Sequence, residues 1–393
     1  MATFMSMNHK EPEHLSLLRN SLRQFIEKEM PRDKVNEWDK NDHFPQDIYE
    51  KLCALGVTSL TVPEDYGGSG LDIISTIAVI EELASRSLGL ASGYIYCSCY
   101  AGLNLLDVAS EQQKKDFLPR VAEGKLMFSY GISEPDVGAD VASVKTNAVR
   151  DGDSLIINGS KRWCSGAKIT NYIYTLVRTG PPEDRYKNLS LVLIPPNTEG
   201  VIIEPQQTLG QKGTGGTCDV TFNDVRIPIN LLVGEEEGWN KGWEKIVRTG
   251  LDVEKIEVAA LAYGIAKAAV EDAWMYAQDR FQFGKAISTY QSIRHMLADA
   301  QAKLEACRLM TYEGASIADQ QLVDPAKMSM IKLFVTETAA DIVLSCQKVL
   351  GAYGYSRDFC MERYVRDILA MPILGGSSAI QKNNIANRLG LLK

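Results

Sequence analysis

The stretch that decides the fold is residues 126–146, L-M-F-S-Y-G-I-S-E-P-D-V-G-A-D-V-A-S-V-K-T, because the periodicity of the chain changes here. Before Leu126 apolar residues recur with a helical period; after it the chain breaks into short β-type runs bounded by Gly, Pro and Asn. The stretch contains a glycine turn between acidic residues, and backbone N–H groups around Gly138 could form an anion-binding nest. A surface loop of a β domain explains this turn equally well.

A helical pattern precedes this stretch, and it returns only after the β-type runs. Residues 12–60 carry an apolar period close to 3.6 and residues 73–109 are apolar nearly all round, which predicts a helical N-terminal domain over residues 1–125. The β-type runs predict a middle β domain over residues 126–235, and the returning helical period predicts a C-terminal four-helix bundle over residues 236–393. We therefore expect an α+β protein. No strand–GxGxxG–helix unit occurs, which excludes a Rossmann domain.

Composition and charge exclude several classes of function. The chain has 393 residues, 45% of them hydrophobic, and a net charge of −8, with no basic stripe, so nucleic acid and anionic membranes are poor partners. With four His and no C-x-x-C pair we expect no metal site. Eight scattered Cys, no visible leader peptide and no 18-residue apolar run predict a cytoplasmic protein without membrane insertion.

The segment I-N-G-S-K-R-W-C-S-G-A, residues 157–167, is a candidate contact for a planar cofactor. Asn158-Gly159 predicts a tight turn. Trp163 beside Ser165 offers a flat face and a hydrogen bond. A core Trp in a β sandwich is an equal alternative at this point.

Two segments near the C-terminus could bind phosphate. In residues 279–293 Arg280 ends a helix and could hold a pyrophosphate, while the segment alone favours the alternative that it neutralises the helix C-terminus. The segment R-D-I-L-A-M-P-I-L-G-G-S-S-A-I-Q, residues 366–381, places two glycines before two hydroxyls, which is typical of a backbone that approaches a phosphate or a ring. A helix stop followed by a turn is the alternative.

Taken together and in this order, these segments resemble one family, the acyl-CoA dehydrogenases, which are flavoproteins that oxidise acyl-CoA thioesters. The resemblance covers nearly the whole chain and implies that FAD binds between the β domain and the C-terminal helices. The residues that it places at FAD are Tyr130, Ser133, Gly138, Trp163, Ser165, Arg280, Phe283, Gln291, Gln347, Gly351 and Ser377. The residues that it places at the acyl-CoA are Ala139, Asp252, Lys255, Gly375 and Gly376.

Two residues depart from the family pattern at the FAD site. The flavin loop commonly reads G-S-D, but here Ala139 replaces the hydroxyl residue. The C-terminal loop usually has Gln two residues after a Thr, but here Ala379 follows Ser377. Each missing hydrogen bond contributes about 1 kcal/mol net, and backbone N–H groups can substitute, so FAD binding is still expected.

The family chemistry needs a carboxylate as general base. Most members carry it in a Y-E-G-T motif, where this chain has Leu374-Gly375-Gly376-Ser377 and therefore a glycine in place of Glu. A minority, including the isovaleryl and long-chain enzymes, carry it in a motif similar to L-D-x-E-R. Residues 251–255 read L-D-V-E-K, and Glu254 matches the position of the base. Apolar residues at 258, 261 and 265 share a face with Glu254. An ordinary first-turn Glu is the alternative, and Glu257 is a weaker candidate base.

The resemblance implies FAD-dependent α,β-dehydrogenation of an acyl-CoA. Glu254 would remove the α proton, the β hydrogen would pass as hydride to flavin N5, and an electron-transfer flavoprotein would take the electrons. We expect a short, branched, cyclic or functionalised acyl group and a homo-oligomer, as a dimer of dimers, because Arg280, Phe283 and Gln291 would reach a neighbouring subunit's FAD. Enoyl-CoA reduction, as in the crotonobetainyl-CoA reductase group, sulfinopropionyl-CoA desulfination and a non-enzymatic flavin-bearing scaffold stay open.

Overall fold

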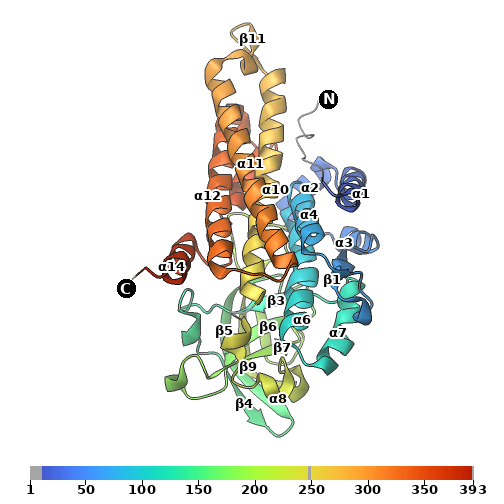
Figure 1. Cartoon of the computed structure of the whole chain (residues 1–393), viewed down its shortest axis with the longest axis vertical. Coiled ribbons are helices and arrows are strands. Elements are labelled where there is room, and N and C mark those ends of the chain that lie inside the picture. The colour runs from blue at the N-terminus through green and yellow to red at the C-terminus, as the bar shows by residue number, and fades with distance from the viewer. Residues whose placement is uncertain (1–10, 247–248, 392–393) are drawn as a thin grey trace.

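The computed structural model describes residues 11–246 and 249–391, and all structural statements here concern these residues. Within them the chain runs through helices, then a sheet, then helices, which confirms the expected α+β architecture (Figure 1). The sheet occupies one end of the molecule, and the long C-terminal helices extend away from it. None of the described helices is long and apolar enough to cross a membrane.

The N-terminal region combines helices with one apolar side, such as α1, and helices that are buried nearly all round, such as α4. Ser110 and Gln113 form a reciprocal capping box that starts α7. The elements are α1 (Glu13–Glu29), α2 (Arg32–Asn41), α3 (Gln46–Cys53), η1 (Val57–Leu60), β1 (Thr61–Val62), η2 (Glu64–Tyr66), β2 (Gly70–Leu71), α4 (Ile73–Ala84), α5 (Leu88–Tyr94), η3 (Ile95–Leu103), α6 (Asn104–Val108) and α7 (Glu111–Ala122). Of these, η3 is a π-helix, a wide helical form that is rare and frequent at functional sites.

The middle region is one seven-stranded sheet with its own core. Its order is β3-β6-β4-β5-β9-β8, and β7 pairs with β6. The strands are β3 (Phe128–Gly131), β4 (Asn147–Asp151), β5 (Ser154–Ser165), β6 (Tyr172–Arg178), β7 (Leu189–Ile194), β8 (Val201–Pro205) and β9 (Thr217–Pro228), with short 3₁₀ turns η4 (Val141–Ser143), η5 (Pro182–Asp184) and η6 (Ile229–Leu231).

The tight turn predicted at Asn158-Gly159 is wrong. Both residues lie inside β5, where Asn158 pairs with Asn147 and the register with β9 shifts between Ile157 and Gly159. Gly159 has φ 140°, so a strand irregularity, and not a turn, uses its conformational freedom. The hairpin between β4 and β5 turns instead at Gly152.

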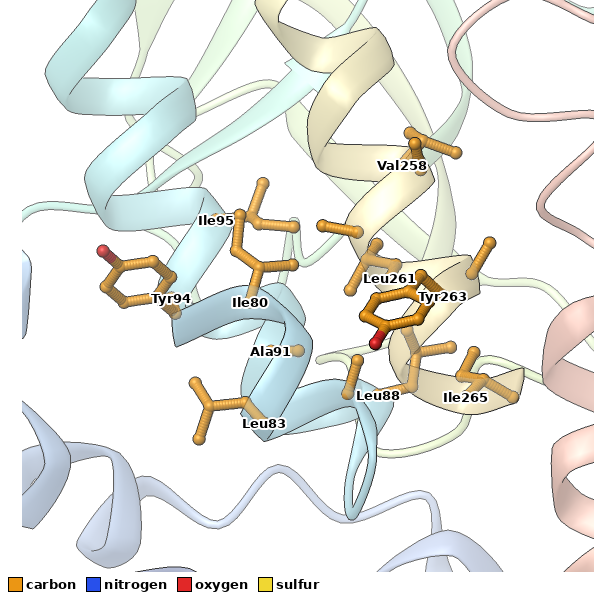
Figure 2. Packing of buried hydrophobic residues seen from close by; sticks show 14 of the residues in the cluster. Ile80, Leu83, Leu88, Ala91, Tyr94, Ile95, Val258, Leu261, Tyr263 and Ile265 are labelled. Atoms are coloured by element: carbon orange, nitrogen blue, oxygen red, sulfur yellow. The ribbon is translucent and has the colours of Figure 1, made fainter. Parts of the chain in front are cut away.

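The C-terminal region contains three long helices, α10 (Thr249–Asp279), α11 (Gln291–Asp319) and α12 (Pro325–Leu350). Around them lie α8 (Glu235–Gly238), α9 (Gly242–Ile246), β10 (Phe281–Gln282), β11 (Lys285–Ala286), η7 (Ile287–Thr289), η8 (Gly351–Gly354), α13 (Met361–Ile368) and α14 (Ser378–Arg388). A continuous apolar core joins these helices to the N-terminal region. Figure 2 shows Ile80 and Leu88 of the N-terminal region on the side that faces Leu261 of α10.

Candidate active site

The candidate base lies in the second turn of α10. Glu254 is only 8% exposed, and its Oε1 accepts a hydrogen bond of 3.1 Å from the Tyr100 hydroxyl. The Tyr100 ring stacks on the Tyr130 ring with a centroid distance of 3.8 Å and an angle of 6° between the planes. Asn104 donates to the Tyr130 hydroxyl at 2.6 Å. Residues from α10, η3, α6 and β3 therefore meet at one buried place.

The π-helix η3 is what brings Tyr100 to this place, and our sequence analysis missed it. Residues 73–109 were predicted only as buried helix, because apolar residues all round a helix give no face to assign. The run Tyr94, Tyr96 and Tyr100 was the available signal, since tyrosine hydroxyls are hydrogen-bonded when buried. In the structure Tyr94 donates to the Val57 carbonyl and Tyr96 to the Thr214 carbonyl, so of the three only Tyr100 reaches Glu254.

The glycine loop after α13 faces the same carboxyl. Gly375 and Gly376 have φ of 59° and 81°, in the left-handed region that favours glycine. A Cβ added to Gly375 would lie 3.7 Å from Cδ of Glu254 and 3.3 Å from Cγ2 of Val258. The place from which a side chain at position 375 would project therefore adjoins Glu254.

Two side chains that sequence analysis missed hold this loop. Lys332 of α12 donates to the Gly376 carbonyl at 2.9 Å. Gln381 of α14 donates to the carbonyls of Gly375 and Gly376 at 3.1 and 2.8 Å. Lys332 belongs to no motif that the sequence showed, and Gln381 ends the segment 366–381 without a predicted role. Both are recognised only through the loop that they contact.

Burial dominates the electrostatics of the site. It raises the pKa of Glu254, against the hydrogen bond from Tyr100 and the positive charges of Lys255 and Lys332, which lower it. Burial, and then the neighbouring Glu254, raise the pKa of Glu257 to about 8. Burial lowers the pKa of Lys332 to about 8, although the negative charge of Glu254 opposes this. A carboxyl with a raised pKa in an apolar site is suited to proton transfer near neutral pH.

On the side of the sheet, β5 presents an exposed tryptophan. Trp163 is 57% exposed and has φ 68°, at a second register shift between Lys161 and Cys164. The alternative of a core tryptophan is therefore wrong. Ser165, two residues on, lies 3.3 Å from Thr217 between the two hydroxyl oxygens.

The end of β5 adjoins η3. A Cβ added to Gly166 would lie 2.5 Å from Cε2 of Tyr96, and the rings of Tyr96 and Tyr100 are 5.9 Å apart. The structure thus brings Tyr130, Ser165, Glu254 and the Gly375-Gly376 loop into one continuous region.

The flavin-loop residues lie on the exposed edge of the sheet. Glu134 and Val137 exchange backbone hydrogen bonds of 2.9 and 3.1 Å, and Gly138 and Ala139 beyond them are exposed. The Ser133 carbonyl accepts from the Arg162 amide at 2.9 Å. The roles predicted for Ser133, Gly138 and Ala139 stay predictions.

Other predicted site residues lie at the far end of α10. Arg280 follows its last residue, and 26 positions at about 1.5 Å each separate it from Glu254 by roughly 39 Å. Phe283 is 94% exposed, and Gln291 begins α11 beyond the β10–β11 hairpin (Figure 1). Arg280 lies over the ring of Tyr353 in η8.

Gln347 and Gly351 belong to this far group too. Gln347 donates to the Gly354 carbonyl at 3.3 Å, and Gly351, with φ 60°, caps α12. The structure therefore divides the predicted FAD residues between two distant places on one chain.

Asp252 and Lys255, predicted at the acyl-CoA, form a buried ion pair with each other. Ser377 is the N-cap residue of α14, directly after the glycine loop. The ligand roles of these residues stay predictions.

Comparison with known proteins decides the family. Family models for the N-terminal, middle and C-terminal domains of acyl-CoA dehydrogenases match residues 12–125, 129–225 and 240–390. The chain belongs to the acyl-CoA dehydrogenase family. It is thus an enzyme of a flavoprotein family of oxidoreductases that act on acyl-CoA, and a flavin cofactor is implied.

Individual members of the acyl-CoA dehydrogenase family cover almost the whole chain. The chain is 33% identical to a 3-(aryl)acrylate reductase of Clostridium sporogenes, over 96% of this chain and 98% of that protein. It is 31% identical to the CarC subunit of the caffeyl-CoA reductase-Etf complex of Acetobacterium woodii, with the same coverage of 96% and 98%. The structure of butyryl-CoA dehydrogenase from Megasphaera elsdenii matches with a TM-score of 0.91 and 26% identity, over 98% of this chain and 100% of that one.

Proposed function

We propose that this protein catalyses FAD-dependent α,β-dehydrogenation of an acyl-CoA with Glu254 as general base. The observation that carries this is the position of Gly375. A Cβ at position 375 would lie 3.7 Å from the Glu254 carboxyl carbon. A carboxylate from α10 can therefore act where the carboxylate of a Glu in the C-terminal loop would act. The apolar surroundings and the Tyr100 hydrogen bond keep Glu254 aimed at that place.

The residues around this place fit a flavin. Trp163 exposes a flat face, Ser165 follows it with a hydroxyl, and Ser377 heads the N-terminus of α14, where backbone N–H groups favour a phosphate. FAD, when bound there, supplies the acceptor for the β hydrogen as hydride. The chain's own part is to hold the thioester and to take the α proton onto the Glu254 carboxylate.

The separation of Arg280 from Glu254 supports a homo-oligomer. No single FAD spans the roughly 39 Å between them, so Arg280, Phe283 and Gln291 serve the FAD of another copy. We infer a dimer of dimers, in which each FAD is shared across an interface.

An electron-transfer flavoprotein is the inferred redox partner, because the similar CarC protein is a subunit of a complex with Etf. Whether the enzyme oxidises an acyl-CoA or reduces an enoyl-CoA depends on this redox partner. Two relatives are reductases of aryl- or caffeyl-type substrates, which supports enoyl-CoA reduction as the second candidate. In that direction the protonated Glu254 returns its proton to the α carbon.

The stacked Tyr100 and Tyr130 rings beside Glu254 favour a flat or functionalised acyl group over a long alkyl chain.

The test is anaerobic titration of the oxidised flavoprotein with straight, branched, cyclic, acidic and aryl acyl-CoAs, followed by bleaching of the flavin band. We expect at least one of them to bleach the wild type. Glu254→Gln should slow bleaching by about 10²–10⁴-fold, while the exposed control Glu244→Gln should not.

Two results would overturn this function. Full turnover by Glu254→Gln would favour base-free chemistry such as desulfination. Purified protein that binds no flavin would reject FAD-dependent dehydrogenation.

A further inference from the structure

A second buried carboxyl lies one helical turn beyond the proposed base. Glu257 is 3% exposed, and its Oε2 has no hydrogen-bond partner among the described residues. Residues three apart on a helix are neighbours, so Glu254 and Glu257 occupy adjacent positions beside η3. Neither is among the carboxylates that make ion pairs within the described residues.

The groups that face the two carboxyls differ. Glu254 receives the hydroxyl of Tyr100 from η3, with Lys332 of α12 and Lys255 of its own helix as nearby cations. Glu257 faces the Cys99 thiol of η3, which is a weak donor. The phenol groups of Tyr100 and Tyr130 lie in the field of both carboxyls.

Two adjacent carboxylates in an apolar site cannot both ionise cheaply, so near neutral pH the pair keeps a proton. A strong O–H donor and two cations stabilise the charged form of Glu254, and within residues 11–246 and 252–391 no comparable group faces Glu257. The asymmetry arises from η3, whose Tyr100 reaches one carboxyl and whose Cys99 reaches the other.

We propose that Tyr100 and Glu257 are positioning residues for the base: Tyr100 fixes the charge of the pair on Glu254, and Glu257 holds the proton. This rests on the proposed function of Glu254. It means that the enzyme enters turnover with the base already ionised, although the base is buried beside a second carboxyl.

The first test locates the proton without using activity. Infrared difference spectra at pH 7 between the wild type and each variant should show a protonated carboxyl band that Glu257→Gln removes and Glu254→Gln leaves. A band removed by Glu254→Gln, or by neither variant, would overturn the proposal, whether or not any acyl-CoA bleaches the flavin.

The second test uses the pH profile of kcat/KM with an acyl-CoA that bleaches the wild type. Tyr100→Phe keeps the ring stack but removes the donor, so the acid limb should move upward by roughly 1 to 2 pH units. Tyr96→Phe, from the same π-helix but bonded to Thr214, should leave the limb in place. Adding Glu257→Gln to Tyr100→Phe should return the limb toward the wild type, because only Glu254 can then carry the charge.

An unmoved limb in Tyr100→Phe, or an equal movement in Tyr96→Phe, would contradict the assignment to Tyr100. If Glu254→Gln loses turnover and either of these results is found, Glu254 remains the proposed base and only the positioning role of Tyr100 is rejected. Full turnover by Glu254→Gln would instead reject the proposed function itself.

Discussion

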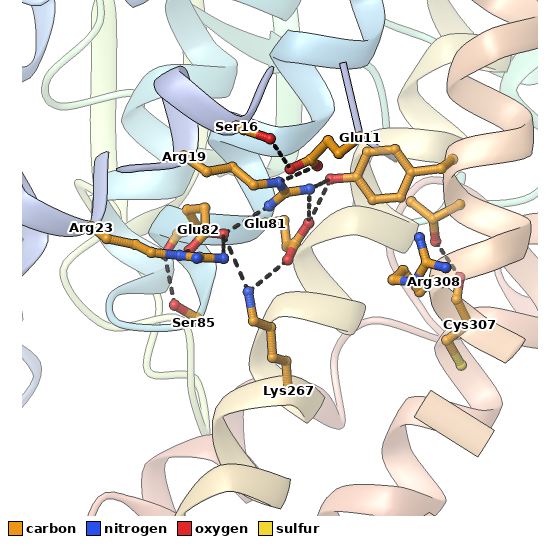
Figure 3. A network of polar contacts seen from close by, with 12 residues as sticks. Glu11, Ser16, Arg19, Arg23, Glu81, Glu82, Ser85, Lys267, Cys307 and Arg308 are labelled. Carbon is orange, nitrogen blue, oxygen red and sulfur yellow. Dashed lines mark hydrogen bonds and ion pairs between the residues drawn. The ribbon is translucent and has the colours of Figure 1, made fainter. Parts of the chain in front are cut away.

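The same helix core contains two pairs of buried glutamates, and they differ in their partners. Glu81 and Glu82 of α4 contact Arg19 at 2.9 and 2.7 Å, and Lys267 lies 2.7 Å from Glu81 (Figure 3). Tyr312 donates to Glu81 at 2.5 Å, much as Tyr100 donates to Glu254 at 3.1 Å. Glu254 and Glu257 have a tyrosine but no ion-pair partner among the described residues.

The partners reverse the direction of titration. Burial by itself would raise the pKa of Glu81, but Lys267 and Arg19 outweigh it and lower that pKa to about 2. Burial is not outweighed at Glu257, whose pKa rises to about 8. Glu81 and Glu82 therefore stay charged and join α1, α4 and α10, whereas Glu254 and Glu257 can exchange a proton. Buried glutamates thus form a structural ion-pair cluster in one place and the proposed reactive site in the other.

Breaking the charged pair should have the largest effect. Lys267→Met leaves two buried carboxylates short of a cation, and we expect the free energy of unfolding to fall by about 3–5 kcal/mol. Denaturant unfolding measures this. Lys303→Met, which removes a largely exposed ion pair with Asp299, should cost less than about 1 kcal/mol. Equal losses in both variants would remove the contrast between the pairs.

The next largest difference between the two pairs should be the pH dependence of the free energy of unfolding. The folded pKa of Glu257 lies above its unfolded value, so its favourable contribution is complete below about pH 4.5 and is lost as the pH rises toward 8. Between pH 5 and 7 the wild type should lose up to about 1.4 kcal/mol per pH unit relative to Glu257→Gln.

Glu81 has the opposite sign, because its folded pKa lies below its unfolded value. Its contribution is present above about pH 4.5 and is lost as the pH falls toward 2. Parallel stability curves for the wild type and Glu257→Gln across pH 5 to 7 would show that Glu257 titrates normally.

An apolar substitution should then have opposite effects on the two pairs. Glu257→Met removes a buried carboxyl whose Oε2 has no hydrogen-bond partner among the described residues, and it should stabilise the fold by about 1–2 kcal/mol at pH 7. Glu82→Met removes a partner of Arg19, Arg23 and Lys267 and should destabilise it. The two effects are measured by thermal unfolding of both variants. A Glu82→Met variant as stable as the wild type would show that the ion pairs of Glu82 do not stabilise the fold.

The smallest effect is expected from the tyrosine of the charged pair. Tyr312→Phe removes the hydrogen bond to Glu81 and the one that the Tyr312 hydroxyl accepts from Arg19, but Arg19 and Glu81 stay in direct contact, so it should cost about 1 kcal/mol. Because Glu81 keeps its cations, the pH profile of kcat/KM should stay that of the wild type, in contrast to Tyr100→Phe. A moved profile in Tyr312→Phe would mean that the charged pair also influences the base.

Several features follow from the sequence because they depend on local patterns. The change of period at Leu126 predicts the order helices–sheet–helices, and the structure has it. The loop Gly375-Gly376 shows by its composition that it has no carboxyl, and residues 251–255 offer one on a helix. The exposure of Trp163 was open in the sequence, since a tryptophan in a strand can face either side, and the Asn158-Gly159 turn was wrong because the strand continued through it.

The sequence by itself thus determined the fold and supplied Glu254 as a candidate base. Only the tertiary structure decided that Gly375 faces Glu254, that a π-helix brings Tyr100 to it, and that Lys332 and Gln381 hold the loop. The reason is physical: the charge of a buried carboxyl depends on the groups within a few ångströms, and these come from segments far apart in the chain. Both glutamate pairs lie in apolar helical stretches of the sequence, and it is their contacts that move their pKa values in opposite directions.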